Sequence, residues 1–458
     1  MIRRTVAISC FCLVLVGLVA ACSSSSGQPV HSPSVPVSPR PSQAISTEWT
    51  QYHRDAGRSG LGPAEPALTT PKEAWRLAVD GDVYASPLIV AGHVIVATEN
   101  NTVYSLDMFT GSVVWMVHLG EPVSARSLPC GNIGPVTGIT ATPAADIAGG
   151  KLYVVAFLST HHHMLFALGL VDGSVSWQQD VDPVGSNPSV QQFRGALSVA
   201  SGFVYVPVGG LFGDCGAYHG YVVAVPVAGG QGRAFLVSSA RGASVWSPMG
   251  VSVASDGTLY FVTGNAIGSS AVAYSNSVIQ LSPDLSVKSY FTPSNFVALN
   301  AGDVDLGSVG ATLLADGRVL SIGKEGVAYL LRGGALGGVG GEITSRHVCS
   351  GAWGGTATLD TTVFVPCLDG LYALSVGSTI NVLWHDTNPV LGTPIVAAGA
   401  VWAMEPDSGT IYALDPSNGH ELFSTGLGAA MHFSTPAATD GFVVVPAGQK
   451  VVALSVVG

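Results

Sequence analysis

The feature that most constrains the fold of this 458-residue chain is a short segment that returns along its whole length. Its clearest copy, at 103–115, reads VYSLDMFTGSVVW, and near echoes are LFALGLVDGSVSW at 165–177 and IYALDPSNGHELF at 411–423. Each copy is an apolar alternating strand, a glycine-containing turn and a second strand. Such repetition indicates an array of like units that bury a continuous core by stacking on one another.

Eight such units can be counted from the first strand of each. These strands are expected at 85–90, 141–145, 195–199, 247–253, 310–314, 355–359, 393–396 and 434–437. An apolar second strand follows each of them, third and fourth strands follow in most units, and helical periodicity is almost absent. We therefore predict an all-β fold, an eight-bladed β-propeller of four-stranded antiparallel blades.

The eighth unit offers only three strands of its own. An N-terminal strand at 73–79, EAWRLAV, is predicted to supply its outer strand, so that the two ends of the chain close the ring together. Residues 49–60 are expected to pack across that closure.

The N-terminus has the order of a signal peptide: a basic start, an apolar run over 6–21 and small residues. The segment Val19-Ala-Ala-Cys22 resembles the bacterial lipobox, which predicts a signal peptide at 1–21 and a diacyl, palmitate-type anchor on Cys22. An ordinary secretory signal with a chance cysteine is the alternative. Residues 22–47, rich in Ser and Pro, are predicted to be a flexible tether to a propeller domain at 48–458.

Composition narrows the classes of partner. The formal charge is −11 with only 10% charged residues, which argues against nucleic acid, whose binders carry clustered Lys and Arg. No second apolar run reaches membrane-spanning length. We expect an exported protein held on the extracytoplasmic side of the bacterial cell membrane by its lipid anchor.

Four cysteines remain outside the predicted signal peptide and Cys22. In an exported chain they indicate two disulfides, for which three connectivities exist. The pairing that spans the shortest distances joins Cys349 to Cys367 within one blade and Cys130 to Cys215 between neighbouring blades.

Ionisable residues are expected to collect at one end of the ring. In a propeller the turn between the second and third strands and the loop that enters the next blade emerge on the same face. That face, the loop face, is predicted to receive all four cysteines and a set of polar residues: Glu99, Asn100, 161–163, Asp214, His219, Asn265, Asp303, Asp305, Lys324, Glu325, Asp369, Glu405, Asp407 and Lys450.

The Leu-Asp, Thr-Gly and Trp pattern of the repeat resembles that of the pyrroloquinoline-quinone-type eight-bladed propellers, from Trp49 to the C-terminus. That family contains quinoprotein alcohol dehydrogenases. It also contains non-enzymatic lipoproteins, among them a scaffold of the outer-membrane β-barrel assembly machinery.

The resemblance implies roles for four residues in the central blades. Asn265, in YFVTGN, is similar to a calcium ligand of the dehydrogenases, and Lys324, in GKEG, to the lysine that touches the quinone. Asp303 and Asp305, in NAGDVDLGS, resemble a segment whose first acid is the catalytic base and whose second can bind the metal. In such a site a calcium ion polarises the quinone, a carboxylate base removes the alcohol proton, and a lysine offsets the negative charge that develops.

Three departures from the family pattern count against catalysis. The position of the remaining calcium ligand is Cys215, a poor ligand for calcium, so that Asp214 has to replace it. The adjacent cysteine pair of the soluble dehydrogenases and the tryptophan before the Asp-x-Asp segment are missing. A structural role for Asp303 and Asp305, accepting bonds from turn amides, is the alternative.

Two other sets of residues admit a binding role. His161, His162 and His163 could bind zinc or copper together with His219. The alternative is that the three histidines lie in a solvated loop without a metal. Four tryptophans could stack on a sugar or polysaccharide, although such residues also lock propeller blades together: Trp246, Trp353, Trp384 and Trp402.

The function expected from the sequence is that of a lipid-anchored scaffold or binding protein, without turnover and without a cofactor. Its loop face would hold an envelope protein partner or a small ligand. The alternative is a dehydrogenase of alcohols or sugars that depends on calcium and pyrroloquinoline quinone.

Overall fold

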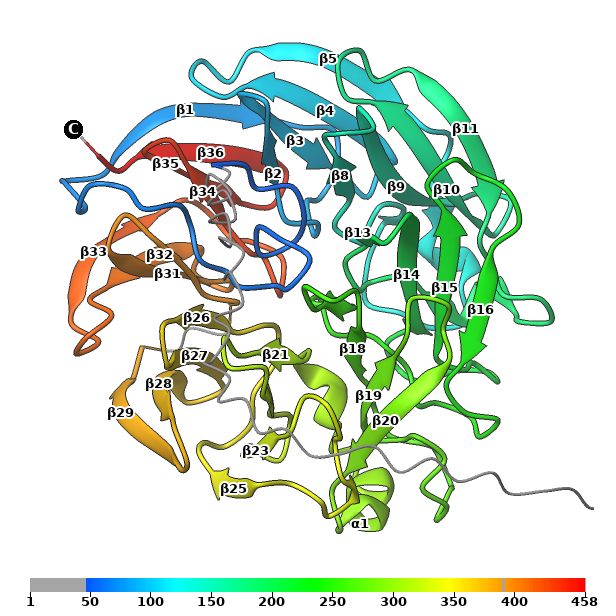
Figure 1. Cartoon of the computed structure of the whole chain (residues 1–458). Coiled ribbons are helices and arrows are strands. Elements are labelled where there is room, and N and C mark those ends of the chain that lie inside the picture. The colour runs from blue at the N-terminus through cyan, green and yellow to red at the C-terminus, as the bar shows by residue number, and fades with distance from the viewer. Residues whose placement is uncertain (1–46, 389–391, 458) are drawn as a thin grey trace, which may run out of the picture. The chain divides into compact units, whose positions relative to one another are not determined.

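A computed structural model describes residues 47–388 and 392–457. Eight antiparallel sheets follow one another around a ring, as predicted (Figure 1). Cys22, the signal peptide and nearly all of the tether lie outside the described residues. No helix among the residues described is long and apolar enough to cross a membrane.

The blades are numbered here in chain order, and each is given from its innermost to its outermost strand. Blade 1 is β2 (Leu88–Val90), β3 (His93–Ala97), β4 (Thr102–Asp107) and β5 (Val113–His118). Blade 2 is β8 (Ala144–Asp146), β9 (Lys151–Leu158), β10 (His162–Gly169) and β11 (Val175–Asp180). Blade 3 is β13 (Ser198–Ala200), β14 (Phe203–Gly210), β15 (Tyr221–Pro226) and β16 (Arg233–Leu236). Blade 4 is β17 (Ser252–Val253), β18 (Leu259–Val262), β19 (Val278–Leu281) and β20 (Val287–Thr292).

The second half of the ring continues in the same order. Blade 5 is β21 (Thr312–Leu313), β22 (Val319–Ser321), β23 (Val327–Leu331) and β25 (Thr344–His347). Blade 6 is β26 (Ala357–Leu359), β27 (Thr362–Cys367), β28 (Gly370–Val376) and β29 (Ile380–Asp386). Blade 7 is β30 (Ile395–Ala397), β31 (Ala400–Glu405), β32 (Thr410–Leu414) and β33 (Glu421–Gly426). Blade 8 is β34 (Ala437–Thr439), β35 (Phe442–Pro446), β36 (Lys450–Ser455) and the N-terminal β1 (Lys72–Ala78).

Blade 8 joins the two ends of the described chain, as the sequence predicted. Strand β1 pairs antiparallel with β36, with Leu77 opposite Val451. The first and last strands therefore lie side by side in one sheet (Figure 1).

Small additions break the regularity of the predicted four-stranded blades. Blade 3 gains β12 (Gln191–Gln192), which pairs with β14, and blade 4 gains β24 (Gly338–Val339), parallel to β20. Strands β6 (Val123–Ser124) and β7 (Val136–Thr137) form a separate hairpin. The described residues also contain one short helix and three 3₁₀ turns: α1 (Phe296–Ala301), η1 (Ala125–Ser127), η2 (Pro188–Val190) and η3 (Leu306–Ser308).

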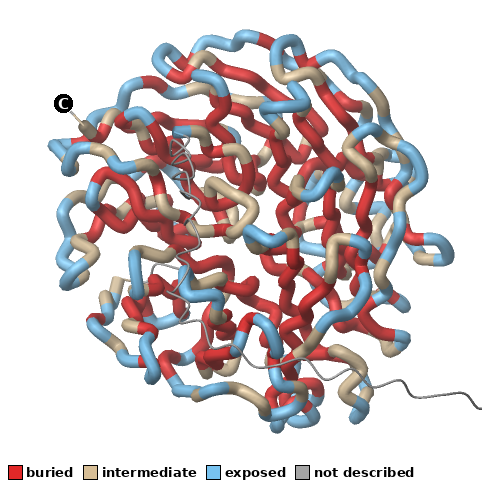
Figure 2. The backbone as a smooth tube through the Cα atoms, in the orientation of Figure 1, coloured by how far each residue is buried: buried red, intermediate tan, exposed pale blue. Residues whose placement is uncertain are grey.

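Burial explains the apolar alternation of the repeat. Inner strands such as β3 and β4 are buried on both faces, because neighbouring blades cover them. The outer strand β5 buries Trp115 and exposes most of its other residues. Figure 2 shows the same trend for the molecule, with buried residues gathered in its interior and exposed ones along its edge. The core is therefore a continuous band of the first three strands of each blade.

A tryptophan on the outer strand of one blade packs on a turn glycine of the next. The ring of Trp75 covers Gly111, whose φ is +69° and whose added Cβ would lie 2.6 Å from that ring. The indole Nε1 of Trp75 also donates to the carbonyl of Met108, at 2.7 Å. This contact, the tryptophan lock, recurs in three further pairs: Trp115 with Gly173, Trp177 with Gly229, and Trp384 with Gly419. Each tryptophan lock is thus made of the Trp of one copy of the repeat and the Gly of the next copy, which belong to successive blades.

The N-terminal segment 47–62 crosses the channel at the end of the inner strands. It exchanges backbone hydrogen bonds with residues of blades 1, 2, 4, 6 and 7, and Arg58 donates to the Leu197 carbonyl of blade 3 at 2.8 Å. Trp49, Tyr52 and Arg58 are almost completely buried. The Thr439 hydroxyl of blade 8 donates to the Thr47 carbonyl. The segment was predicted to cover the closure between blades 8 and 1, but it is hydrogen-bonded to seven of the eight blades.

Candidate functional site

A pocket of about 520 Å³ lies on the loop face, around the ring axis. The turns between second and third strands of blades 3 to 7 contribute to it, together with the loops that enter several blades. All five residues predicted for the central site line this one pocket: Asp214, Asn265, Asp303, Asp305 and Lys324. The structure therefore brings together residues that are up to 110 positions apart.

An ion pair between Asp305 and Lys324 forms the centre of one wall. Lys324 Nζ lies 2.7 Å from Asp305 Oδ2 and 3.4 Å from Asp303 Oδ1. It also donates to the Asp303 carbonyl at 3.1 Å, while Asp305 Oδ1 accepts from the backbone N–H of Asn265 at 2.6 Å. Both oxygens of the buried Asp305 carboxylate are thus bonded to the protein itself.

Burial acts on both members of this ion pair. It raises the pKa of Asp305 above its ordinary value. Burial would lower the pKa of Lys324, but the carboxylates of Asp305 and Asp303 outweigh it, so that the pKa of this amine is raised. Lys324 therefore carries a positive charge that two aspartates already compensate.

Glycines allow Asp305 to approach its partners. An added Cβ at Gly264 would lie 2.6 Å from Asp305 Oδ1, and one at Gly323 would lie 2.4 Å from the Asp305 carbonyl. Gly264 follows β18 and Gly323 follows β22, so the segment before η3 lies between two neighbouring second strands. This is the reason that the TGN and GKEG turns act as one site.

Asp214 lies across the pocket in a left-handed turn, with φ of 53°. Its Oδ1 accepts from the Tyr218 hydroxyl and its carbonyl accepts from Arg241. Burial and the Asp214 carboxylate raise the pKa of Tyr218, which keeps the phenol protonated. The next residue, Cys215, is joined to Cys130 and is not a metal ligand.

The acidic side chains of the pocket are not gathered as a calcium ion would require. Calcium takes about six to eight oxygen ligands, several of them commonly carboxylates. Among the described residues, no group of three or more His, Cys, Asp or Glu ligand atoms within 4.8 Å of one another includes Asp214, Asp303 or Asp305. The ammonium of Lys324 lies between the two acids of the Asp-x-Asp segment, where a divalent cation would meet a like charge. As arranged, these residues fit an organic ligand rather than calcium.

Aromatic rings form the rest of the wall, and sequence reasoning missed part of it. Trp246 lies 5.6 Å below Lys324 Nζ and 6.2 Å from the ring of Phe433. The guanidinium of Arg194 lies over the ring of Phe433, 5.6 Å from its centre, and Arg194 Nη1 is 3.0 Å from His432 Nε2. Arg194, His432 and Phe433 were not predicted. The available signal was an arginine immediately before an otherwise apolar inner strand, in QQFRGALSV.

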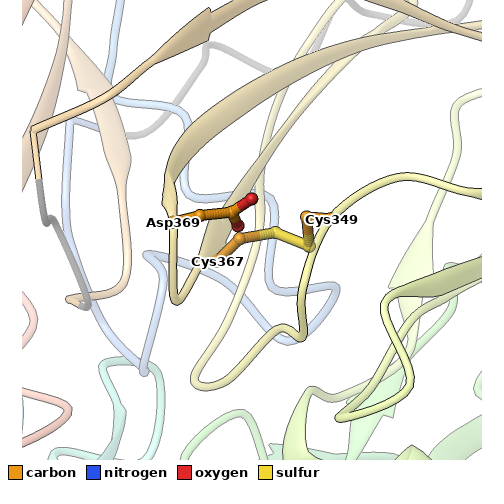
Figure 3. A group of neighbouring side chains, drawn as sticks. All are labelled: Cys349, Cys367 and Asp369. Carbon is orange, nitrogen blue, oxygen red and sulfur yellow. A yellow bond between two sulfur atoms is a disulfide. The ribbon is translucent and has the colours of Figure 1, made fainter.

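Both predicted disulfides are present, on the loops that surround the pocket. Cys130 bonds to Cys215, and Cys349 bonds to Cys367 with Asp369 beside it (Figure 3). Phe212 and Leu368, which line the mouth of the pocket, are 67% and 48% exposed. The disulfides therefore fix the loops that carry two exposed apolar side chains at the rim.

The histidine cluster predicted for zinc or copper is not assembled. His162 contacts Asp180 at 2.7 Å, and buried His163 contacts Asp182 and stacks between Phe157 and Phe193. His161 bonds to serine hydroxyls, whereas His219 Nδ1 lies 2.9 Å from the Ala240 carbonyl. Because each ring already has a local partner, blade 2 and blade 3 do not combine their imidazoles.

Two of the four tryptophans proposed for sugar stacking have structural roles instead. Trp384 forms a tryptophan lock, and Trp402 is completely buried with its indole Nε1 donating to the Ala397 carbonyl. Trp246 and Trp353 do line the pocket. Two of the acids expected on the loop face, Glu99 and Glu405, are buried and do not lie on its surface.

Comparisons with known proteins show what this chain is similar to. A family model described as outer membrane protein assembly factor BamB matches residues 67–283. No curated protein matches the chain in sequence. Among solved structures, quinohemoprotein alcohol dehydrogenase ADHIIG from Pseudomonas putida HK5 is 12% identical, with a TM-score of 0.72 over 89% of this chain and 80% of that one.

Two further solved structures share the fold. A europium-containing methanol dehydrogenase is 14% identical, with a TM-score of 0.69 over 88% of this chain and 90% of its own. BamB from Moraxella catarrhalis is 14% identical, with a TM-score of 0.57 over 84% of this chain and 98% of its own. Identities this low show the fold alone. By its repeats and its fold, the chain is a pyrroloquinoline-quinone-type eight-bladed β-propeller.

Proposed function

We propose that this propeller is an exported, lipid-anchored binding protein that acts without turnover, through the pocket on its loop face. The observation that carries the proposal is the position of Lys324, whose ammonium is bonded to both Asp305 and Asp303. The acid expected to act as a base and the acid expected to bind metal thereby share a cation that belongs to the chain itself. A pocket of about 520 Å³ with exposed apolar side chains at its rim is suited to holding a ligand or a side chain of a partner.

An envelope protein is the kind of macromolecular partner we propose. The matching family model carries the description of an outer membrane protein assembly factor, and that description supports a protein partner for this chain. Phe212 and Leu368 at the mouth of the pocket provide the apolar contact that such a partner would cover.

Reconstitution tests the absence of turnover. The purified protein is incubated with calcium and pyrroloquinoline quinone, and dye reduction is recorded with alcohols and with sugars. We expect none. Dye reduction that disappears in Asp303→Asn, but persists in the exposed control Asp316→Asn, would contradict the proposal.

Capture from solubilised membranes tests the binding role. The bait is compared with a Phe212→Ser, Leu368→Ser variant and with Val184→Ser, a fully exposed control outside the pocket. We expect one envelope protein to be enriched by the wild type and the control and lost with the rim variant. Equal recovery with all three baits would exclude the rim as the binding surface.

The lipid anchor is tested separately. Cys22→Ser is expected to abolish the incorporation of labelled palmitate into the protein. Labelling that survives this change contradicts the anchor but leaves the pocket's role untouched.

The second candidate function is a dehydrogenase of alcohols or sugars. It is favoured by one observation, the convergence of Asn265, Asp303, Asp305 and Lys324 on a pocket with Trp246 beside them. If pyrroloquinoline quinone were bound, it would supply the redox chemistry, with Trp246 as a stacking surface. Against it stands Lys324, whose ammonium lies between the two aspartates that would face the calcium ion.

A further inference from the structure

One histidine and two aspartates meet at the outer part of blade 2, away from the axial pocket. Strand β10 pairs with β11 so that Met164 lies opposite Asp180, which brings His162 beside the chain that continues past Asp180. His162 Nδ1 lies 2.7 Å from Asp180 Oδ2 and 3.4 Å from Asp182 Oδ2. One nitrogen and two carboxylate oxygens thus lie within 4.8 Å of one another. None of the three residues lines the pocket.

The two carboxylates are held in place by groups behind them. The side chain of Asp182 is only 7% exposed, its Oδ1 is 2.7 Å from His163 Nδ1, and its Oδ2 accepts from the His163 N–H at 3.1 Å. Asp180 Oδ1 accepts from the N–H of Asp182 at 2.8 Å. The His163 ring is in turn fixed between the rings of Phe157 and Phe193. The positions of both acids therefore follow from the fold.

The charge of these acids is not compensated by a permanent cation. Among the residues that the structure describes, no Lys or Arg nitrogen lies within 4.0 Å of the carboxylate of Asp180 or Asp182. Their partners are imidazoles and backbone amides. A carboxylate as buried as that of Asp182 is costly unless it is paired or bound to a metal.

The three ligand atoms suit zinc better than calcium or magnesium. Zinc accepts imidazole nitrogen and carboxylate oxygen at about 2.0 to 2.2 Å, so two ligands of one tetrahedral ion lie about 3.3 to 3.6 Å apart. The separation of His162 and Asp182 already has this value. That of His162 and Asp180 would widen from 2.7 Å, which is possible because these side chains are 51% and 45% exposed. Calcium and magnesium prefer oxygen ligands alone.

We propose that His162, Asp180 and Asp182 bind a zinc ion, with water as the fourth ligand. His163 orients the ligand Asp182 from the side away from the ion, as the outer partners of metal ligands do. This set of ligands differs from the four-histidine set, because His161 and His219 are bonded elsewhere and take no part. The inference is independent of the proposed function.

The ion would join two parts of the loop face. His162 lies at the start of β10, whereas Asp182 lies in the loop that leads to blade 3. That loop also carries Phe193, which packs on His163. A metal ion that binds the folded chain more tightly than the unfolded chain raises the unfolding temperature. We therefore expect zinc to stabilise the ring.

Calorimetric titration of the whole purified protein, without an affinity tag and after treatment with a chelator, tests the inference. We expect one zinc ion per chain, and a loss of affinity of at least about tenfold in both His162→Ala and Asp180→Asn. The matched control is His118→Ala, which changes a histidine that is 42% exposed and 4.0 Å from a single acid, Glu121. It is expected to bind zinc as the wild type does. Thermal unfolding without zinc shows that each variant is folded, and zinc should raise the unfolding temperature of the wild type and the control alone.

Four results would overturn the inference. The folded wild type may take up no zinc, or its affinity may persist in His162→Ala and Asp180→Asn, which would place the ion elsewhere. An equal loss in His118→Ala would indicate unspecific binding to surface histidines. Magnesium that displaces zinc at equal concentration would reduce the site to a pair of acids. Since none of these measurements involves the pocket, a partner or dye reduction, the proposed function is judged by its own experiments.

Discussion

Blades 8, 1 and 2 carry residues that join one blade to the next, whereas blades 3, 4 and 5 carry residues that line the pocket. Each of the first three carries an outer-strand tryptophan that packs on a glycine of the following blade. The outer strands of blades 3, 4 and 5 contain no tryptophan, and in blades 3 and 4 the second and third strands are separated by the long turns 211–220 and 263–277. Those turns carry Asp214 and Asn265. The repeat is therefore clearest where it joins blades and weakest where the pocket is built.

The largest expected effect on stability is that of removing a tryptophan lock, and it tests whether the lock tryptophans and the pocket tryptophans have different roles. Trp115→Ala should lower the free energy of unfolding by about 3 to 5 kcal/mol, because it empties the contact with Gly173. Trp246→Ala, in the half-buried wall of the pocket, should cost less than about 2 kcal/mol. Urea unfolding monitored by circular dichroism measures both. Equal losses would mean that the two tryptophans do not have different roles.

A second test concerns the ion pair of the pocket. Lys324→Met removes the main partner of a buried carboxylate and should cost about 2 to 3 kcal/mol at neutral pH, less than a fully buried pair because Lys324 is 19% exposed. Adding Asp305→Asn should restore most of the loss, since no buried unpaired charge then remains and the carboxylate of Asp303 is 62% exposed. Urea midpoints of the single and double variants give the coupling. A double variant weaker than both single variants would contradict this account.

The pH dependence of stability should expose a buried acid of blade 1. Burial raises the pKa of Glu99 to about 7 in the folded protein, above the value of about 4.5 in the unfolded chain. The protonated form is thus favoured by folding: its stabilising contribution is complete below pH 4.5 and is lost as the pH rises through 7. The change amounts to about 3 kcal/mol. Unfolding free energies of Glu99→Gln should lack this fall, and a wild-type slope that survives in the variant would assign it to other groups.

The smallest expected effect on stability distinguishes the backbone strain of a positive-φ turn from the close contact between the glycine and the tryptophan of a lock. Gly111→Ala places a methyl group 2.6 Å from the ring of Trp75 and should cost about 2 kcal/mol or more. Gly92→Ala has a similar positive φ but no atom within 4 Å of the new methyl group, so strain alone, about 1 kcal/mol, is expected. Thermal unfolding temperatures give the difference. If the two variants are equally affected, the glycine serves the turn and not the tryptophan.

Much of the ring was predictable because its information is local. The alternation in each unit places the strands, and the unmatched third strand of the last unit predicts the pairing of β1 with β36. The convergence of Asp305 and Lys324 followed from the resemblance of their turns to a family pattern. Both cysteine pairings followed from the rule that assigns loops to one face.

Other parts of the site depend on contacts across the axis that no local pattern records. Arg194 and His432 are 238 residues apart, and neither lies in a copy of the repeat. Trp246 and Trp384 look alike in sequence, but one precedes an inner strand and lines the pocket while the other lies on an outer strand and joins blades. His219 was expected beside the histidine triplet, and a nearby carbonyl holds it instead.

The N-terminal segment has a mechanical consequence. A force that reaches the ring through the residues before Thr47 acts first on hydrogen bonds shared among seven blades, including the bond from Thr439 of blade 8, before it can reach the edge strand β1. Those bonds share the load across the axis, whereas β1 taken alone would separate from β36 one residue pair at a time. Tension from that end is therefore carried by the centre of the ring before it reaches the pairing of β1 with β36.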